Sequence, residues 1–157
     1  MTDQQTNFQA ALRLSGIEIK ETDRYLFRGK SIENTRNHKD GDWCVGDLWQ
    51  YLSGRAKVFT DEGWVEVDPS TVGQYTGFTC PDKNGVIQKV FEGDIFEFDR
   101  SEWGGNDNIH LVSWNSNGEW CFGGGSVKGD MEWRTLIGNI HDNSELLNQP
   151  KGTTPTK

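Results

Sequence analysis

Histidine and cysteine residues are the first candidates for chemistry, and their spacing indicates neither a metal site nor a redox pair. The chain carries His38, His110 and His141, and its cysteines are Cys44, Cys80 and Cys121. Zinc sites need ligands at short characteristic intervals, and a thioredoxin-like site needs a CxxC pair. The sequence therefore predicts no metal, no cofactor and three reduced thiols.

Three other segments have residue types used by known ligand loops or catalytic pairs, but none has the full pattern. The turn "DKNG" could begin a calcium loop at Asp82, yet Val86 replaces an oxygen ligand and Gly93 stands at the twelfth position, where Glu is required. The segment "FGGGSVKGD" lacks the GxxxxGK[ST] order of a phosphate-binding loop. Asp61 and Glu62 are adjacent, which suits a solvated turn better than acid–base chemistry. We therefore expect no enzyme; a hydrolase would require a clustered acid–base set in a pocket.

Tryptophan is abundant and admits two interpretations. The seven residues could form a stacking platform for bases, sugars or a peptide, or they could fill the core of a small β protein. Most lie within strand-like runs, which favours the core. Trp103, in "SEWGGND", is the exception and is a candidate binding residue. The seven are Trp43, Trp49, Trp64, Trp103, Trp114, Trp120 and Trp133.

Composition limits the class of protein and of partner. The chain has 157 residues, which suits one domain, and 19 Gly against 4 Pro favour many tight turns. A formal charge of −8 repels phosphate backbones, so it disfavours nucleic acid and fits a protein partner better. The N-terminus has no signal-peptide pattern, and no run of about 18 apolar residues could cross a membrane. We expect a soluble, intracellular protein.

Short β-like runs follow one another at intervals of about ten residues, which predicts a mainly β fold. Residues 1–22 form an N-terminal extension with a weak helical pattern, and 149–157 is a polar tail expected to be disordered. Asp68 is expected to cap a helical turn opened by Pro69, and "HDNSELLNQ" predicts a short C-terminal helical turn.

Asparagine–glycine and glycine–aspartate pairs predict where the strands turn. Asn84–Gly85 and Asn117–Gly118 are suited to the positive φ angles of hairpin turns. The segments "CVGDLW" and "FEGDIF" share a Gly–Asp pair, at Gly46–Asp47 and Gly93–Asp94. In both we expect glycine to permit a sharp turn and aspartate to accept backbone N–H groups at a strand entrance.

The segment "DPSTVGQYTGFTCPDKNGVIQKVFEGDIFEF" resembles the YopX family of phage and prophage proteins, which show a "tvGqyTGlkDknGkkIyeGDIv" pattern. The matched residues are Thr71, Val72, Gly73, Gln74, Tyr75, Thr76, Gly77, Asp82, Lys83, Asn84, Gly85, Glu92, Gly93, Asp94 and Ile95. The segments "FRGK", "GDWCVGDL" and "LIGNIHDNSELL", the last with Gly138 and Asn139, agree as well. The resemblance covers about residues 24–147. The inserted "TCP" before Asp82 departs from the pattern and leaves the hairpin register open.

The resemblance implies a phage-borne β protein without an assigned activity, which supplies no catalytic residues and forms a homo-oligomer. We expect residues 23–148 to form the β domain, with an SH3-like barrel over about 86–140 packed against additional strands. We expect a non-enzymatic accessory protein that binds a host or phage protein in the host cytoplasm; the alternative is a nucleic-acid-binding barrel. Gln74 and Tyr75 are not explained by turn chemistry. They are candidates for a buried hydrogen-bond network or a contact surface.

Overall fold

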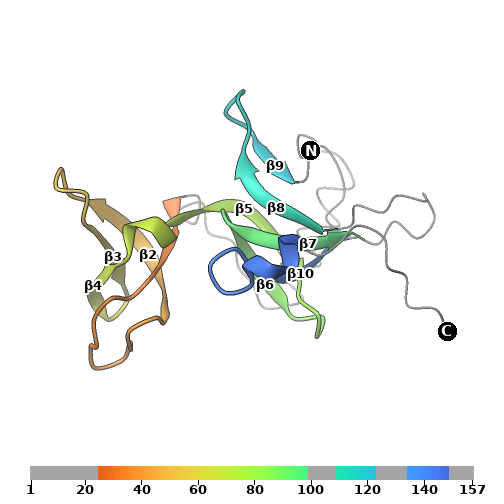
Figure 1. The fold of residues 1–157 in the computed structure, drawn as a ribbon. Helices are drawn as coiled ribbons and strands as arrows, with labels where there is room; N and C mark the ends of the chain where they lie inside the picture. The colour runs from red at the N-terminus through yellow and green to blue at the C-terminus, as the bar shows by residue number, and fades with distance from the viewer. Residues whose placement is uncertain (1–24, 99–108, 123–133, 149–157) are drawn as a thin grey trace, which may run out of the picture.

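Two antiparallel sheets make up the fold (Figure 1). The structure, a computed structural model, describes residues 25–98, 109–122 and 134–148. One sheet has six strands in the order β4-β3-β2-β1-β5-β6 and the other has four in the order β10-β7-β8-β9. The elements are β1 (Phe27–Lys30), β2 (Trp43–Gln50), β3 (Ala56–Thr60), β4 (Gly63–Val67), η2 (Pro69–Thr71), β5 (Gly73–Pro81), β6 (Ile87–Phe91), β7 (Asp94–Phe98), β8 (Ile109–Trp114), β9 (Trp120–Phe122), β10 (Arg134–Asn139) and η4 (Ser144–Asn148).

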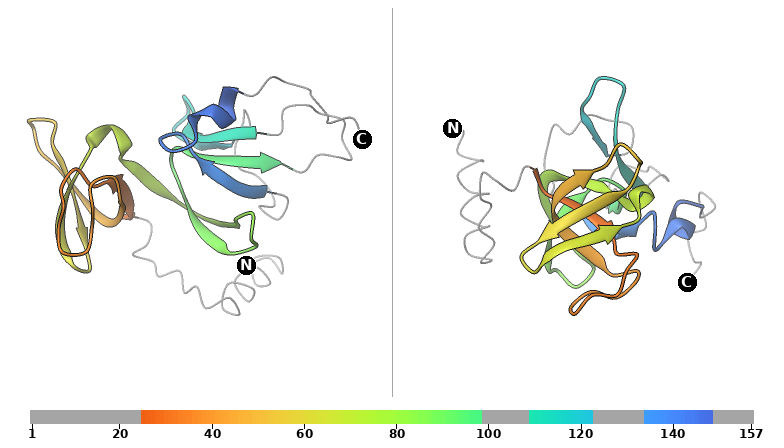
Figure 2. Two further views of the ribbon diagram at one scale, coloured as in Figure 1. Left: turned by 60° about the horizontal axis from the view of Figure 1, so that its bottom comes forward. Right: turned by 90° about the vertical axis from the view of Figure 1, so that its left-hand side faces the viewer.

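The strands gather into two lobes, which Figure 2 shows side by side with β5 running from one to the other. We call β1–β4 the first lobe and β5–β10 the second lobe. Between them, β1 pairs with β5 over only two registered pairs, Phe27 with Gln74 and Arg28 with Gly73. Side-chain contacts must therefore supply much of the connection between the lobes.

The first lobe is a curled sheet with its own core. Residues alternate along β2, β3 and β4, so that one side chain in two faces inward, as the pleat of a strand requires. The end of β4 returns to the chain after β1, where Ile32 N donates to Glu66 O and Asp68 N donates to Lys30 O, at 3.0 and 2.8 Å. The buried core residues are Cys44, Ala56, Val58, Val65 and Val67.

Gly46 allows β2 and β3 to approach closely in this curled sheet, because it has no side chain. It lies inside β2 and has no positive φ, and a Cβ at this position would overlap with the backbone carbonyl of Phe59 on β3. The expectation of a sharp turn at Gly46–Asp47 is therefore wrong. Asp47 is an exposed residue in the middle of the strand rather than a cap at its entrance.

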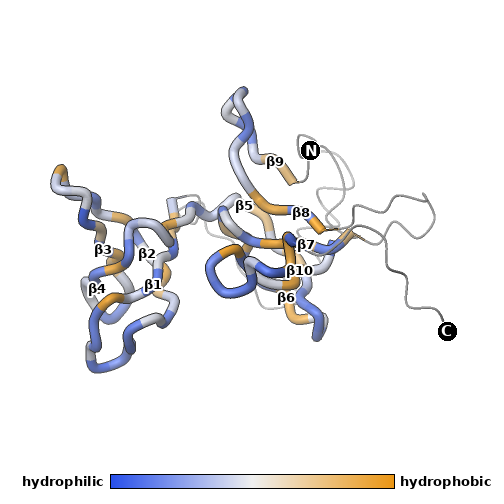
Figure 3. Tube along the Cα trace, in the orientation of Figure 1, coloured by the Kyte–Doolittle hydropathy of each residue, from blue (hydrophilic) through white to orange (hydrophobic). Residues whose placement is uncertain are grey.

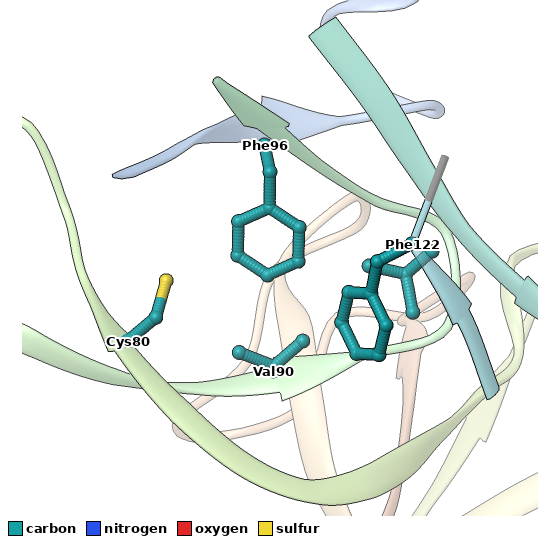
Figure 4. Packing of buried hydrophobic residues seen from close by; sticks show 5 residues of the cluster. Cys80, Val90, Phe96 and Phe122 are labelled. Atoms are coloured by element: carbon teal, nitrogen blue, oxygen red, sulfur yellow. The ribbon is translucent and has the colours of Figure 1, made fainter. Parts of the chain in front are cut away.

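The second lobe packs the β5–β6 hairpin against the four-stranded sheet. Phe96 lies at the centre of the packing, completely buried, with Cys80, Val90 and Phe122 around it (Figure 4). Val112 completes the buried cluster. β8 and β9 each have an apolar stretch, and the turn between them is hydrophilic (Figure 3). The buried residues of this lobe come from five different strands, β5 to β9.

Both predicted Asn–Gly turns are present, with a geometry that differs in one respect. Gly85 and Gly118 have φ angles of +77° and +73°, but neither Asn84 nor Asn117 has a positive φ. Each turn instead opens with a side-chain cap: Asp82 Oδ1 accepts from Asn84 N and Val86 N in the first. Three-residue hairpin loops of this kind consist of a type I turn followed by one residue in the left-handed region, which here is the glycine.

Both predicted helical turns are confirmed. Asp68 caps η2, its side chain accepting from Ser70 N at 2.9 Å, and Pro69 opens the turn. The C-terminal turn is η4. The expected N-terminal helix and the expected disordered tail lie outside the described residues.

The mainly β fold is confirmed, but the SH3-like barrel over about 86–140 is not. Within the described part of the chain neither sheet closes into a barrel, and β9 and β10 are the outermost strands of the four-stranded sheet. Leu136 of β10 forms only an isolated bridge with Asp82. β6 pairs with β5 and so belongs to the other sheet. The residues expected to close one barrel are thus divided between two layers.

The preference for tryptophan in the core is wrong for three of the five described residues. Trp49, Trp64 and Trp114 are exposed. Trp120 packs against the core of the second lobe, and Trp43 is half-buried between the lobes. Strand alternation explains the outcome, because Trp49 and Trp64 fall on the outward positions of β2 and β4.

A transmembrane helix was not expected from the sequence. In the ranges that the structure describes, no helix is long and apolar enough to cross a bilayer.

Candidate binding groove between the two lobes

A buried ion pair joins the lobes at the beginning of β7. Arg28 extends from β1, and its Nη2 lies 2.5 Å from Asp94 Oδ1 and donates to Glu92 O at 3.2 Å. Asp94 Oδ2 accepts from Phe91 N at 2.7 Å. The Asp94 carboxylate is therefore held by both lobes, and only 1% of the residue is exposed.

The Gly93–Asp94 pair behaves as the sequence predicts. Gly93 has φ of +83°, in the region that favours glycine, and so lets the chain turn sharply between β6 and β7. Its N–H donates to Val112 O at 2.9 Å, which fixes the turn on β8. Asp94 then caps the entrance of β7 through Phe91 N, as expected, and pairs with Arg28, which was not expected.

Burial raises the pKa of Asp94 to about 6, and the nearby Arg28 charge together with the Phe91 N–H limits the rise. Desolvation disfavours the charged carboxylate more than these two partners favour it. Asp94 therefore titrates close to neutral pH, although it sits in an ion pair.

The Asp94 titration can be measured directly. In carboxyl ¹³C NMR, we expect the Asp94 signal to move with a midpoint near pH 6. In an Arg28→Met variant the midpoint should move to higher pH, because the main interaction that lowers the pKa is gone. Lys39→Met, which removes a charge from an exposed loop, is the matched control and should leave the midpoint unchanged. A wild-type midpoint near pH 4 would contradict this assignment.

Trp43 on β2 is the aromatic centre of the junction. The Arg28 guanidinium lies 4.5 Å and the Lys30 ammonium 5.4 Å from its ring centroid, within the range of cation–π contacts. The His141 ring lies 5.9 Å away. Burial, followed by the charges of Arg28 and Lys30, lowers the pKa of His141, so this imidazole is neutral at pH 7.

Asp142 connects the end of β10 to the first lobe. Its carboxylate forms a salt bridge with Lys30 and accepts from Trp43 Nε1 and Asn139 Nδ2, both at 2.8 Å. Partial burial raises the pKa of Asp142, but these three donors together outweigh that effect and lower the pKa to about 2. Asp142 is therefore ionised at every pH where the protein is expected to work.

Beside this junction lies an open groove with a volume of about 700 Å³. Its floor contains the buried residues Arg28, Phe91 and Asp94, and its walls come from β2, the β5–β6 hairpin and β10. The apolar lining is Trp43, Val45, Ile87, Phe91, Leu136 and Ile137, and the remaining lining is Arg28, Asp82, Lys83, Asn84, Gln88, Lys89, Asp94, Gly138 and Asn139.

The charged residues that line the groove are Arg28, Lys83, Lys89, Asp82 and Asp94. Its two carboxylates are already engaged: Asp94 by Arg28, and Asp82 by the N–H groups of its own turn and by Gln88 Nε2. The hydrogen bonds from the turn lower the pKa of Asp82. Lys83 on the hairpin tip is exposed and forms no ion pair within residues 25–98, 109–122 and 134–148.

The predicted site residues are only partly brought together. Asn84, Asp94, Gly138 and Asn139 all line the groove. Tyr75 is buried and packs against Phe91 at 5.5 Å between ring centroids, so it is not a contact surface.

Gln74 pairs with Phe27 in the sheet, and Gly73 is required there because a Cβ would lie 2.6 Å from Glu92 O. Gly77 takes a left-handed conformation inside β5, where the register with β6 shifts. Trp103 lies outside the described residues.

Sequence reasoning missed the residues that give the groove its chemistry. Arg28 and Trp43 belong to the segments "FRGK" and "GDWCVGDL", which agree with the family pattern, but nothing in their local spacing indicates that they meet Asp94. In the part of the chain that the structure describes, no group of three or more His, Cys, Asp and Glu side chains could hold a metal.

Comparison with known proteins identifies the family. No curated protein matches the chain significantly. A family model described as YopX protein matches residues 19–148, which include every strand of both lobes and every residue that lines the groove. The chain belongs to the YopX family.

Proposed function

We propose that this protein is an accessory protein of a phage or prophage, which acts in the host cytoplasm by binding a segment of a partner protein in the groove. The single observation that carries the proposal is the groove itself. It lies between two lobes, where binding sites often occur, and its volume of about 700 Å³ falls in the usual range for ligand sites. The YopX family supports the phage origin.

The lining favours a peptide segment with apolar and acidic side chains. Val45 and Ile87 offer apolar walls, and Lys83 and Lys89 supply positive charge in a chain with net charge −8. Three consecutive residues of β6 line the groove, and β6 is the last strand of the six-stranded sheet. An extended segment could therefore add to this edge through backbone hydrogen bonds.

We infer binding rather than catalysis from the state of the titratable groups. A general base must be free to accept a proton from a substrate. Asp94 is buried against Arg28, and Asp142 is held by Lys30 and Trp43 with a pKa of about 2. These carboxylates are better suited to hold the lobes together.

Nucleic-acid binding is the alternative, and the exposed rings of Trp49, Trp64 and Trp114 favour it. The net charge of −8 opposes it, since phosphate backbones are bound mainly through Lys and Arg. Affinity for single-stranded DNA that falls with added salt would support this alternative over the groove.

The groove proposal is tested by matched substitutions on two of its walls, β2 and the β5–β6 hairpin. Tagged wild type and the variants Val45→Glu and Lys83→Glu are used to capture proteins from lysogenic host cells, and a captured partner is then purified for direct titration. We expect each groove variant to bind the partner with an affinity at least about tenfold lower, which corresponds to roughly 1.4 kcal/mol of binding free energy. The controls Val86→Glu and Lys39→Glu alter exposed residues outside the groove and should bind as wild type does. Equal binding by all five proteins would contradict the proposal.

A further inference from the structure

The outward face of the first lobe carries a cluster of exposed aromatic rings. We propose that this aromatic face binds a proline-rich segment of a partner protein, with a basic residue of that segment opposite Asp47. The aromatic face is made of Trp49, Tyr51, Phe59 and Trp64. None of these rings lines the groove between the lobes, so the inference does not depend on what the groove binds.

The rings form one contiguous apolar surface. Trp49, Phe59 and Trp64 are 57%, 45% and 49% exposed. The ring centroids of Trp49 and Trp64 lie 6.4 Å apart, and those of Phe59 and Trp64 lie 4.8 Å apart. Contiguous exposed apolar surface marks interaction sites, and tryptophan is enriched among residues that dominate binding energy. The aromatic face therefore has the properties of an interaction surface.

Two of the rings form walls of a shallow depression. The planes of Trp49 and Trp64 are inclined at 78°, which is close to perpendicular. Together with Tyr51 and the half-buried Lys57, they line an open depression with a volume of about 310 Å³. A volume at the lower end of the range for ligand sites suits a side chain or two of a longer ligand.

A ligand on this face is held by side chains. The backbone N–H and C=O groups of a sheet point sideways to the neighbouring strands, and the side chains stand perpendicular to the sheet. At the centre of the face, β3 is paired with β2 on one side and with β4 on the other. A segment lying across the rings therefore gains no backbone hydrogen bonds from β3, whatever its conformation.

A polyproline II segment meets this condition at little cost. Its backbone makes no internal hydrogen bonds and stays solvated, and proline has no N–H group that needs a partner. Such segments bind in aromatic-lined depressions, and they are extended before binding, so little conformational entropy is lost. Lys57, which lies opposite Trp49, can donate hydrogen bonds to the exposed C=O groups of the segment.

Charge favours a basic residue at one end of the segment. Asp47 lies at the end of the face nearest the β3–β4 turn, which adds Asp61 and Glu62. Asp47 forms no ion pair with another described residue. At the opposite end the acid is already neutralised, since Arg55 Nε donates to Glu66 Oε1 at 2.7 Å. Asp47 is therefore the carboxylate that is left to attract a lysine or arginine of the partner.

Strand geometry sets the spacing of the proline and the basic residue. Asp47 and Tyr51 are four residues apart in the sequence. At a rise of about 3.4 Å per residue, they are separated by about 14 Å. A polyproline II helix rises about 3.1 Å per residue, so it spans this separation in about four residues. We therefore expect the basic residue about four residues from the proline that packs on Tyr51.

A synthetic peptide tests the proposal. The probe consists of Pro-Pro-Leu repeats, is about 12 residues long and has an arginine at each end. In isothermal titration calorimetry it should bind the wild-type chain with a dissociation constant below about 1 mM. A flexible Gly-Ser peptide of the same length and charge should not bind measurably. In the ¹H–¹⁵N spectrum, the indole N–H signals of Trp49 and Trp64 should move on addition of the probe, and that of Trp114 in the second lobe should not.

Substitutions then locate the site. Trp49→Ala/Trp64→Ala should lower the affinity for the probe at least about tenfold. The matched control Trp114→Ala, which removes an exposed tryptophan from the second lobe, should bind as wild type does. Asp47→Lys should lower the affinity about threefold and should favour a second peptide that has glutamate in place of each arginine. Circular dichroism confirms that each variant is folded.

Several results would overturn the proposal. One is no binding of the probe to wild type at about 1 mM. Another is binding that persists in Trp49→Ala/Trp64→Ala, which would place the peptide elsewhere on the molecule. Equal affinity of wild type for the arginine and glutamate peptides would remove the role of Asp47. A mass of twice 17.8 kDa that returns to the monomer in the double variant would show that a second copy covers the face. Binding of oligothymidine through these rings, without binding of the probe, would assign the face to nucleic acid.

Discussion

Between pH 4 and pH 7, the wild-type chain is expected to lose about 2 kcal/mol of its unfolding free energy relative to the Asp94→Asn variant. The folded state raises the pKa of Asp94 to about 6, against about 3.9 in an unfolded chain. In this interval the folded state retains a proton that the unfolded state releases, so the contribution of Asp94 to stability falls as pH rises. Asparagine has the same shape and does not titrate.

Urea unfolding of both proteins at intervals from pH 4 to pH 7 measures this loss. The difference between the two free energies isolates Asp94, because all other titrating groups are common to both. Asp142→Asn is a control of opposite sign: its pKa is lowered, so the advantage of wild type should grow up to about pH 5 and then stay constant. A wild-type advantage over Asp94→Asn that is constant with pH would contradict the burial of a titrating carboxyl between the lobes.

Replacing Phe96 with Ala is expected to lower the free energy of unfolding by about 3–5 kcal/mol. Phe96 is completely buried and lies 5.4 Å from Phe122 between ring centroids. Its neighbours come from β5, β6, β8 and β9, so they are held by separate strands and cannot collapse into the space that the ring leaves. Chemical denaturation at pH 7 measures the loss.

The matched control for Phe96 is Tyr51→Ala, which removes an exposed aromatic ring at the edge of the first lobe. A change below about 1 kcal/mol is expected there, since surface substitutions cost little. Comparable losses in the two variants would show that the second lobe does not depend on the packing around Phe96.

Local chemistry made several elements predictable. Asp68 and Pro69 specify η2 because the carboxylate needs only Ser70 N, two residues away. Gly85 and Gly93 specify turns because few other residues tolerate their φ angles of +77° and +83°. Tertiary neighbours are not needed for such features, and they were the most dependable part of the sequence reading.

The errors concern relations between distant strands. Whether β6 pairs forward into a barrel or backward onto β5 depends on register across the whole sheet, which Asn84–Gly85 does not determine. The face on which Trp49 lies depends on the inward position of Cys44 and Leu48, a choice that the aromatic content of β2 conceals. The Arg28–Asp94 pair joins residues 66 positions apart in the sequence, and no local pattern indicates it.

Each lobe has one cysteine whose thiol is buried in its core and is unreactive while the lobe stays folded. Cys44 lies in the core of the first lobe and Cys80 in that of the second. Burial, with the charge of Asp42 added at Cys44, raises the pKa of both thiols, to about 12 at Cys80, so neither is a reactive thiolate in the native state. The rate at which an alkylating reagent modifies each cysteine therefore reports how often its own lobe opens. Cys44 and Cys80 therefore allow the opening of the first lobe and of the second lobe to be measured separately in the same protein.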